Sequence, residues 1–467
     1  MHIVDYFVIA GYFALVMYLG YYSMKKVSSF DDYAVAGRSM PLPIFFAAIA
    51  ATLCGGGATI GRISFMHTTG IIVFFALTGV VINQIFSGLF ISGRVHNAGK
   101  NVYSLGDLYG IYYGRSGRLL SSVFGFLFCV GAFGVQILAM GAILQTATLI
   151  ASIVTLAYTW SGGILAVTLT DAVQYVIIVI GVTLCAYLAI DHLGGFDAMM
   201  SILYSNPRFE TNMKPLANWS LVQFLGLFFS FLLGEFCAPY YIQRYASTKS
   251  AKDSKNGLLI FGVHWIFFMT TTAAIGLASM AIQPDVKPDL AFTNLIRDIL
   301  PPGITGLVFG ALLAAVMSTG AAMINTSAVI YTRDIYNKFI NTAATQAQLL
   351  RQSRLSTLVV GGISIGVAII FQDVFGLMIY MFKLWPSAIL PPLMCGLLWG
   401  KISPYAGAPA VIAGGLSFFL WSDKVLGEPF GIPANFIGIG MNCLVLFFVH
   451  QKMKGHKPEG PFLPDLN

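Results

Sequence analysis

Long runs of apolar residues alternate with short polar connections along almost the whole chain. A helix needs about 20 apolar residues to cross the hydrocarbon core of a bilayer. On this basis we predict thirteen spans, at 3–24, 40–66, 69–93, 119–147, 148–163, 164–190, 219–243, 257–282, 303–331, 355–372, 374–399, 404–421 and 430–450. The fifth span is short, so 119–190 can also be interpreted as two spans instead of three.

The basic residues distinguish these two interpretations. With thirteen spans, 19 of the 26 Lys and Arg residues lie in loops on one side, five lie on the other side and two lie within spans. Cytoplasmic loops carry an excess of Lys and Arg. With only two spans in 119–190, every later loop would change sides and the asymmetry would collapse. The pattern therefore predicts thirteen spans, with the N-terminus outside and the C-terminus in the cytoplasm.

The composition agrees with a polytopic, all-α membrane protein. The chain is 57% hydrophobic and 10% charged, with a mean hydropathy of +0.79, whereas soluble domains carry about 25% charged residues. The net charge of +7 comes from short loops and does not indicate a nucleic-acid partner. The six cysteines are scattered through apolar spans without a C-x-x-C pair, which predicts neither a disulfide framework nor a metal site.

Two of the predicted spans contain residues that interrupt a helix. Three consecutive glycines occupy 55–57 in the second span, and Gly234 and Pro239 bracket Glu235 in the seventh. Each glycine costs roughly 1 kcal/mol relative to alanine in a helix, and proline removes a helix hydrogen bond. Inside a membrane, the freed backbone groups need partners from protein, water, an ion or a solute. Close helix packing is the alternative interpretation of the glycines alone.

The two interrupted spans are five apart, so they cross the membrane in opposite directions. Interrupted segments at matching places in two inverted halves indicate the binding site of a secondary transporter. We predict a single transmembrane domain over 1–467, with the following parts. An extra N-terminal helix and loop occupy 1–39, the two repeats occupy 40–190 and 219–399, an outer loop occupies 191–218, and two extra helices and a tail occupy 400–467.

Oxygen atoms near these breaks predict a cation site. Unwound carbonyls and the C-terminal ends of half-helices attract cations. Ser318 and Thr319, in a run of small residues of the ninth span, would add two hydroxyl groups. Ordinary helix packing by serine and threonine is the alternative interpretation.

Four charged residues lie at membrane depth, where charges are costly and usually functional. Arg62 and Glu235 follow the two breaks and are expected to face each other, either to bind a zwitterion or to neutralise each other as an ion pair. Asp171, at the start of the sixth span, is either a coupling acid or a structural hydrogen-bond acceptor. Lys383 either extends to the interface or lines a cavity.

Five segments resemble the sodium:solute symporter family, which contains sodium–glucose, proline, pantothenate and sialic acid transporters. They are D-D-Y-A-V-A-G-R-S-M (31–40), A-T-I-G-R (58–62), Y-T-W-S-G-G-I-L-A-V-T-L-T-D-A-V-Q (158–174), P-Y-Y-I-Q-R-Y-A-S-T-K-S-A-K (239–252) and A-A-V-M-S-T-G-A-A-M-I-N-T-S-A-V-I-Y-T-R-D-I-Y (314–336). The third segment is the most specific. Together the segments follow the family's order over most of the predicted core.

The resemblance implies a leucine-transporter-like 5+5 inverted repeat, in which the first helix of each repeat is broken, and sodium-driven uptake. It implies a sodium site made by the carbonyls of Ala51, Cys54 and Ala315 and the hydroxyls of Ser318 and Thr319. It places the organic solute against Gly55, Gly56, Gly57, Ala58, Thr59, Arg62, Asn83, Glu235, Pro239 and Tyr240. Sodium would be the coupling ion, with no other cofactor.

Three features depart from the family pattern. Relatives that use a second sodium carry further hydroxyls where this chain has Ala321 and Ala322, which favours one sodium per cycle and leaves Asp171 without its usual partners. Sugar-binding relatives have polar side chains near the breaks, where this chain has Ala58 and Ala238. The link between the fourth and fifth spans is also shorter than in relatives.

We therefore expect a sodium-coupled symporter of a bacterial inner membrane that imports a small polar organic solute by alternating access. Arg62 favours a carboxylate-bearing solute. A proton-coupled transporter, with Asp171 or Glu235 as the proton carrier, is an alternative, and a transporter-like sensor is another. An enzyme is not expected, because the sequence lacks the H-E-x-x-H, G-x-S-x-G and P-loop motifs. The sequence makes no prediction of oligomeric state.

Overall fold

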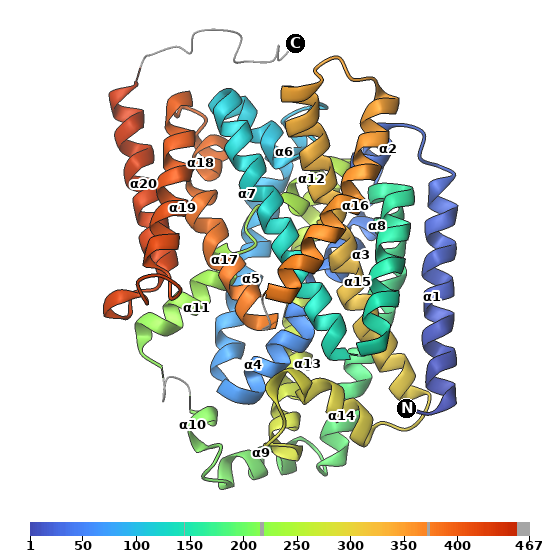
Figure 1. Ribbon diagram of the computed structural model, residues 1–467. Coiled ribbons are helices and arrows are strands. Elements are labelled where there is room, and N and C mark those ends of the chain that lie inside the picture. Colours follow the sequence, from blue (N-terminus) through green and yellow to red (C-terminus); the bar gives the residue numbers. More distant parts are fainter. Residues whose placement is uncertain (144, 215–218, 371–373, 455–467) are drawn as a thin grey trace.

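The computed structural model describes residues 1–454 except 144, 215–218 and 371–373. Its regular elements are all helices in the part of the chain that is described, and most of them run side by side in one bundle (Figure 1). The α-helices are α1 (Ile3–Met24), α2 (Phe30–Val35), α3 (Leu42–Leu53), α4 (Arg62–Thr69), α5 (Ile72–Phe86), α6 (Ser92–Asn97), α7 (Leu105–Ile143), α8 (Gln145–His192), α9 (Phe196–Ser205), α10 (Glu210–Met213), α11 (Leu221–Leu233), α12 (Pro239–Ser247), α13 (Ala251–Ile282), α14 (Ala291–Ile299), α15 (Ile304–Ile330), α16 (Gln346–Ile370), α17 (Val374–Ala388), α18 (Leu390–Met394), α19 (Gly407–Trp421) and α20 (Ala434–Lys452).

Short 3₁₀ and π segments continue or connect these helices. They are η1 (Ala36–Arg38), η2 (Gly57–Gly61), η3 (Ser87–Ile91), η4 (Pro288–Leu290), η5 (Tyr331–Ile340), η6 (Cys395–Trp399), η7 (Pro404–Ala406) and η8 (Pro429–Gly431). Each of the thirteen predicted spans has a helical counterpart among these elements.

The number of membrane-spanning helices depends on how interrupted helices are counted. By length and hydropathy, the described residues form nine spanning helices, or up to eleven when the bent pairs Leu42–Leu53 with Gly57–Thr69 and Gly376–Ala388 with Leu390–Trp399 each count as one span. This count is lower than thirteen for two local reasons. α8 counts once, although Gly163 (φ +52°) interrupts it at the predicted boundary between the fifth and sixth spans. α11 has only 13 residues, and α12 follows it after a break.

The two ends of the bundle carry different elements. Figure 1 shows the N-terminus, α9, α10 and α14 at one end, and the last turn of α20 at the other. The chain therefore crosses the bundle an odd number of times, as thirteen spans require. The predicted boundary between the fourth and fifth spans, at 147/148, is a few residues too late, because α7 ends at Ile143 and α8 begins at Gln145.

The start of the fourth span is earlier than predicted. α7 begins at Leu105 rather than at 119, and Gly114 (φ +64°) interrupts it. The segment before Gly114 contains Asp107. In the structure this carboxylate is buried and lies 2.6 Å from Arg118 Nη1, and the same nitrogen lies 3.1 Å from Asp334 of η5. The ion pairs offset the cost of burying these charges, so the polar segment packs as a helix.

α15 lies at the centre of the molecule. Nearly all of its residues are buried, and it contacts α1, α3, α7, α8 and α16. Its small glycine and alanine residues allow neighbouring backbones to approach closely. α15 carries Ser318 and Thr319, so the predicted cation site lies in the most enclosed part of the bundle.

Candidate functional site

The first break separates α3 from η2 at residues 54–56. The amide of Gly56 donates a hydrogen bond of 2.7 Å to Oε1 of Gln136 on α7. The carbonyl of Gly55 accepts from the amide of Ala58 and from the hydroxyl of Thr59, each at 2.9 Å. Side chains of this chain therefore replace part of the hydrogen bonding that the helix loses at the break.

Each of the three consecutive glycines touches a different helix. A Cβ atom placed on Gly55 would lie 2.1 Å from the hydroxyl oxygen of Thr319 on α15. One on Gly56 would lie 2.3 Å from Cβ of Ala139 on α7, and one on Gly57 would lie 2.3 Å from the sulfur of Met378 on α17. Close packing and a backbone break therefore both occur here, because any larger residue would separate α3 from its neighbours.

Five oxygen atoms gather where α3 meets α15. The Ser318 hydroxyl lies 2.9 Å from the carbonyl oxygens of Ala51 and Ala315. The Thr319 hydroxyl lies 2.6 Å from the carbonyl oxygen of Thr52 and 3.1 Å from that of Ala315. We call these five oxygens the oxygen cluster. Only oxygen atoms are needed to bind a hard cation such as sodium, and unwound helices of transporters supply them in this way.

The oxygen cluster differs in one member from the prediction. Ala51, Ala315, Ser318 and Thr319 are brought together as expected, whereas the cluster contains the carbonyl of Thr52 and not that of Cys54. The register explains this difference. Two successive hydroxyls on α15 face two successive carbonyls on α3, so Thr319 faces the residue that follows Ala51.

The second break separates α11 from α12 over residues 234–238, and Cys237 has a positive φ of +53°. The carbonyl of Leu232 accepts a 2.8 Å hydrogen bond from Nδ2 of Asn83 on α5. The carbonyl of Phe236 accepts one of 2.8 Å from the indole of Trp385 on α17. Asn83, predicted to contact the solute, therefore holds the second break. Trp385 was missed because its partner lies on a distant span.

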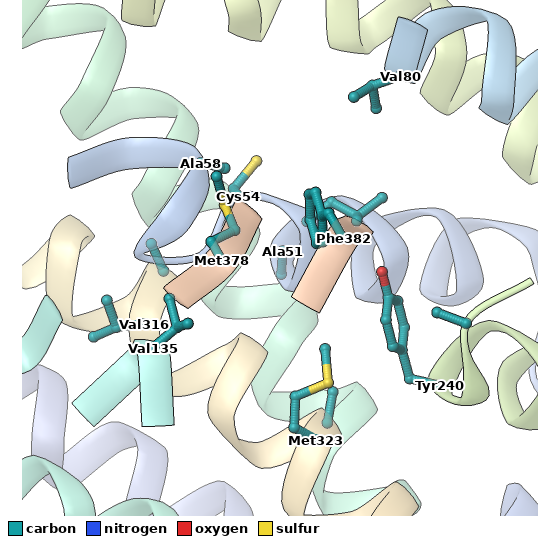
Figure 2. Packing of buried hydrophobic residues seen from close by; sticks show 14 of the residues in the cluster. Ala51, Cys54, Ala58, Val80, Val135, Tyr240, Val316, Met323, Met378 and Phe382 are labelled. Atoms are coloured by element: carbon teal, nitrogen blue, oxygen red, sulfur yellow. The ribbon is translucent and has the colours of Figure 1, made fainter. Parts of the chain in front are cut away.

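A small cavity of about 40 Å³ lies between the two breaks. In this conformation it has room for about three water molecules. Its lining contains the predicted residues Gly55, Gly57, Ala58, Arg62, Thr319 and Glu235, together with Thr52, Leu53, Phe128, Ala132, Val135, Gln136, Met323, Met378, Met381 and Phe382. Figure 2 shows Met378 beside Cys54 and Ala58.

Five residues predicted to bind the solute do not line this cavity: Gly56, Thr59, Asn83, Pro239 and Tyr240. Gly56 bonds Gln136, Thr59 bonds its own helix, and Asn83 bonds the second break. Pro239 begins α12, and Tyr240 stacks on Tyr241 with ring centroids 4.5 Å apart. The missed apolar lining residues of α7 and α17 carry no sequence signal, because apolar residues are equally common on lipid-facing helix faces. Gln136 does carry one, since an amide in an otherwise apolar span is expected to face other helices rather than lipid.

Arg62 lines the cavity with donors that have no partner. Its side chain is 3% exposed, and its Nε and Nη1 atoms have no hydrogen-bond partner among the described residues. The guanidinium carbon lies 4.6 Å from the ring centroid of Trp265 and 5.5 Å from that of Phe231, which stabilises the buried charge. Within the described part of the chain, Arg62 and Glu235 form no ion pair within 4.0 Å, so the self-neutralising pair is not present.

The other two charges at membrane depth are paired. Oδ2 of Asp171 lies 2.7 Å from Nη2 of Arg244 on α12 and 3.4 Å from the hydroxyl of Thr52. The predicted seventh span, 219–243, leaves Arg244 in a loop, but the structure buries it to 1% exposure, because the Asp171 carboxylate offsets its charge. Lys383 does not line the cavity, since its Nζ lies 2.9 Å from Glu428 in the connection before α20.

Comparison with known proteins identifies the family of this protein. The model of the sodium:solute symporter family (SSF) matches residues 33–414. The chain belongs to this family. It is thus a multi-pass membrane transporter that couples the movement of a solute to sodium, and not an enzyme. The family assignment agrees with the resemblance seen in the five sequence segments.

Two similar curated proteins come from bacteria. The osmoregulated proline transporter OpuE of Bacillus subtilis is 25% identical, over 90% of this chain and 89% of that protein. The sodium/proline symporter of Escherichia coli is 24% identical, over 87% of this chain and 85% of that protein.

Solved structures establish the fold of this sodium:solute symporter. A sodium-coupled sialic acid symporter in its substrate-bound outward-open state has a TM-score of 0.82 at 19% identity, covering 97% of this chain and 98% of that one. Mhp1, a nucleobase–cation symporter in a closed conformation, has a TM-score of 0.61 at 14% identity, covering 93% and 96%. The protein therefore has the leucine-transporter-like fold with two inverted repeats of five helices.

Proposed function

We propose that this protein imports a small carboxylate-bearing solute together with one sodium ion by alternating access. The observation that carries the proposal is the oxygen cluster, which joins α3 to α15 directly beside the first break. A sodium ion bound there would contact both helices. Bound sodium would stabilise the conformation in which these oxygens lie together. The size of this stabilisation equals the difference in sodium binding free energy between that conformation and the others.

The cation site and the solute cavity share residues. Thr319 contributes its hydroxyl to the oxygen cluster and also lines the cavity. Gly55 lies against Thr319 and lines the same cavity. A solute that occupies the cavity would therefore contact the residues whose positions decide how well sodium binds, which supports coupled binding of the two.

The cavity lining supports a carboxylate on the solute. Arg62 offers two buried nitrogen atoms without partners, and a guanidinium binds a carboxylate through two parallel hydrogen bonds. Glu235 lines the same cavity and is suited to a positively charged group. The remaining lining is dominated by Met and Phe side chains, which favours a compact apolar body over a sugar. Since the related bacterial proteins are described as proline transporters, L-proline is the first solute to test.

The sodium part of the proposal is tested by thermal stability without any solute. We expect the melting temperature of the purified protein to be higher in sodium than in potassium. The difference should disappear in the Ser318→Ala plus Thr319→Ala double variant, because it lacks both hydroxyls of the oxygen cluster. Ser327→Ala is the matched control, since this α15 hydroxyl bonds the carbonyl of Met323 on its own helix.

The outcomes distinguish sodium from proton coupling. A sodium-selective increase that persists in Ser327→Ala and is lost in the double variant supports the proposal. An equal melting temperature of the unmodified protein in both salts would contradict it. Proton coupling through Glu235 would then be the next hypothesis, because Asp171 is already paired with Arg244.

A further inference from the structure

One face of α7 contacts both sides of the oxygen cluster. Phe133 packs on α15 next to Thr319, since a Cβ atom placed on Gly320 would lie 2.7 Å from the Phe133 ring. Gln136, three residues later, accepts the hydrogen bond from the Gly56 amide at the first break. Residues three apart on a helix lie on the same face. α7 is therefore a third wall of the cation site, although it supplies none of its oxygens.

From these contacts we infer that Gln136 is the positioning residue for sodium binding. It fixes the backbone of the first break so that the Ala51 and Thr52 carbonyls face the hydroxyls of Ser318 and Thr319. The inference rests on the proposed function, because it assumes that the oxygen cluster binds sodium. It adds a residue that neither the sequence segments nor the oxygen cluster itself contains.

The geometry leaves the break little other support at this point. The amide of Gly56 has lost its helical partner, and the Gln136 side chain that meets it is 4% exposed. The same Oε1 atom would lie 3.0 Å from a Cβ atom on Gly55, the residue that lies against Thr319. A shift of Gln136 would therefore move the glycines, and the glycines contact the hydroxyl of the oxygen cluster. Without this bond, a buried amide is left unpaired and the break is free to rearrange.

Gln136 also links this site to the solute. Its side chain lines the cavity together with Arg62, so a bound solute touches the same amide group that holds the break. Among the residues described, the Nε2 atom of Gln136 makes one long hydrogen bond of 3.3 Å, to the carbonyl of Ala132 on its own helix. This leaves the amide nitrogen available to a solute oxygen while Oε1 stays on Gly56.

The test measures the sodium concentration at half-maximal stabilisation in protein without solute, with potassium keeping the ionic strength constant. Gln136→Met removes the acceptor at nearly constant size, and we expect the sodium midpoint to rise at least tenfold. Gln136→Glu restores an acceptor oxygen, and we expect a midpoint within threefold of the unmodified protein. Gln136→Asn keeps the amide but is too short to reach Gly56. If Gln136→Met does not fold, Gln136→Asn replaces it, with the same expected rise of the sodium midpoint of at least tenfold.

Gln84→Met is the control for loss of a buried glutamine. Gln84 is fully buried and donates a 2.6 Å hydrogen bond to the Tyr241 hydroxyl, and it bonds neither the oxygen cluster nor the first break in the described structure. The Gln84→Met variant should have a lower melting temperature but an unchanged sodium midpoint. An unchanged midpoint in Gln136→Met, or a raised midpoint that Gln136→Glu does not restore, would overturn the inference while the proposed function stands. Absence of any sodium effect in the unmodified protein would overturn both.

Discussion

At the scale of single residues, the site is marked by a charge without a partner. Arg244 and Lys383 each lie within 2.9 Å of a carboxylate oxygen. Arg62 is 3% exposed, and among the residues described no carboxylate oxygen lies within 4.0 Å of its guanidinium. Arg244, like Arg62, keeps two nitrogens without a hydrogen-bond partner, so the missing carboxylate is what distinguishes Arg62. A buried charge without a counter-ion costs free energy that a ligand can recover.

Substitution of Arg62 should therefore affect the solute rather than sodium. We expect Arg62→Gln to weaken binding of the carboxylate-bearing solute about 10- to 100-fold, the effect of losing a hydrogen-bonded charge. Arg62→Lys should bind with intermediate affinity, since it keeps the charge but not the planar fork. The measurements are sodium-driven uptake into proteoliposomes and solute binding in sodium.

Arg297→Gln is the control for Arg62→Gln. Arg297 also lies over an aromatic ring, 5.7 Å from the centroid of Phe309, but it does not line the cavity. Its uptake should match that of the unmodified protein. Equal solute affinities of Arg62→Gln and the unmodified protein would contradict a role of Arg62 in binding a carboxylate.

At the scale of elements, the broken helices are held by side chains from other helices. α7 and α15 contact the first break through Gln136 and Thr319. α5 and α17 hold the second break through Asn83 and Trp385. A break held in this way keeps a defined shape inside the membrane, where no water would pair the freed groups. Movement of any of these helices would change the site, which is what alternating access requires.

Adding a methyl group at the first break should separate α3 from α15. A Cβ atom at Gly55 would lie 2.1 Å from the Thr319 hydroxyl, so Gly55→Ala is expected to abolish the sodium-dependent increase in melting temperature. Gly310→Ala on α15 is the control, because a Cβ atom there would meet nothing within 4 Å. It should retain the sodium effect and add up to about 1 kcal/mol of helix stability. A normal sodium effect in Gly55→Ala would show that the oxygen cluster is not the sodium site.

At the scale of the whole molecule, the two ends of the bundle differ in charge and in elements. The short helices α9, α10 and α14 lie at the end that carries the N-terminus (Figure 1). The opposite end carries the last turn of α20, and in the thirteen-span prediction most Lys and Arg residues lie in the loops of that opposite side. Arg118 is one of them, and its ion pairs join Asp107 of α7 to Asp334 of η5. We propose that this basic side faces the cytoplasm of a bacterial cell and that the N-terminus faces outward.

Labelling of single cysteines tests this orientation. In a Cys443→Ser background, which lacks the exposed native cysteine, His2→Cys should react with a membrane-impermeant maleimide in intact cells. Lys452→Cys should react only after the membrane is opened. Reaction of both positions in intact cells would contradict an odd number of crossings. The reverse pattern would mean that the protein is inserted with the opposite orientation.

The apolar spans, the two breaks and the pair of hydroxyls could be predicted without a structure, because they depend on local properties of the sequence. Hydropathy and length identify a membrane helix, consecutive glycines weaken one wherever they occur, and Ser318 with Thr319 is the polar pair in a run of small residues. The family could be recognised in the same way, from five short sequence segments. The number of spans depends on the counting rule only at Gly163, which interrupts α8, and at α11, which is too short to span a membrane alone.

The tertiary structure alone decided which residues meet. The helices are apolar on nearly every side, so periodicity does not tell which face turns inward and which faces lipid. Met378 therefore could not be assigned to the cavity, nor Trp385 to the second break. The amides of Gln136 and Asn83 are recognisable as polar, but which broken segment each of them bonds is decided by the packing. The partner of Asp171 was also undetermined, because Arg244 follows the break in the chain and is brought to Asp171 only by the packing of α12 against α6, α15, α2 and α7.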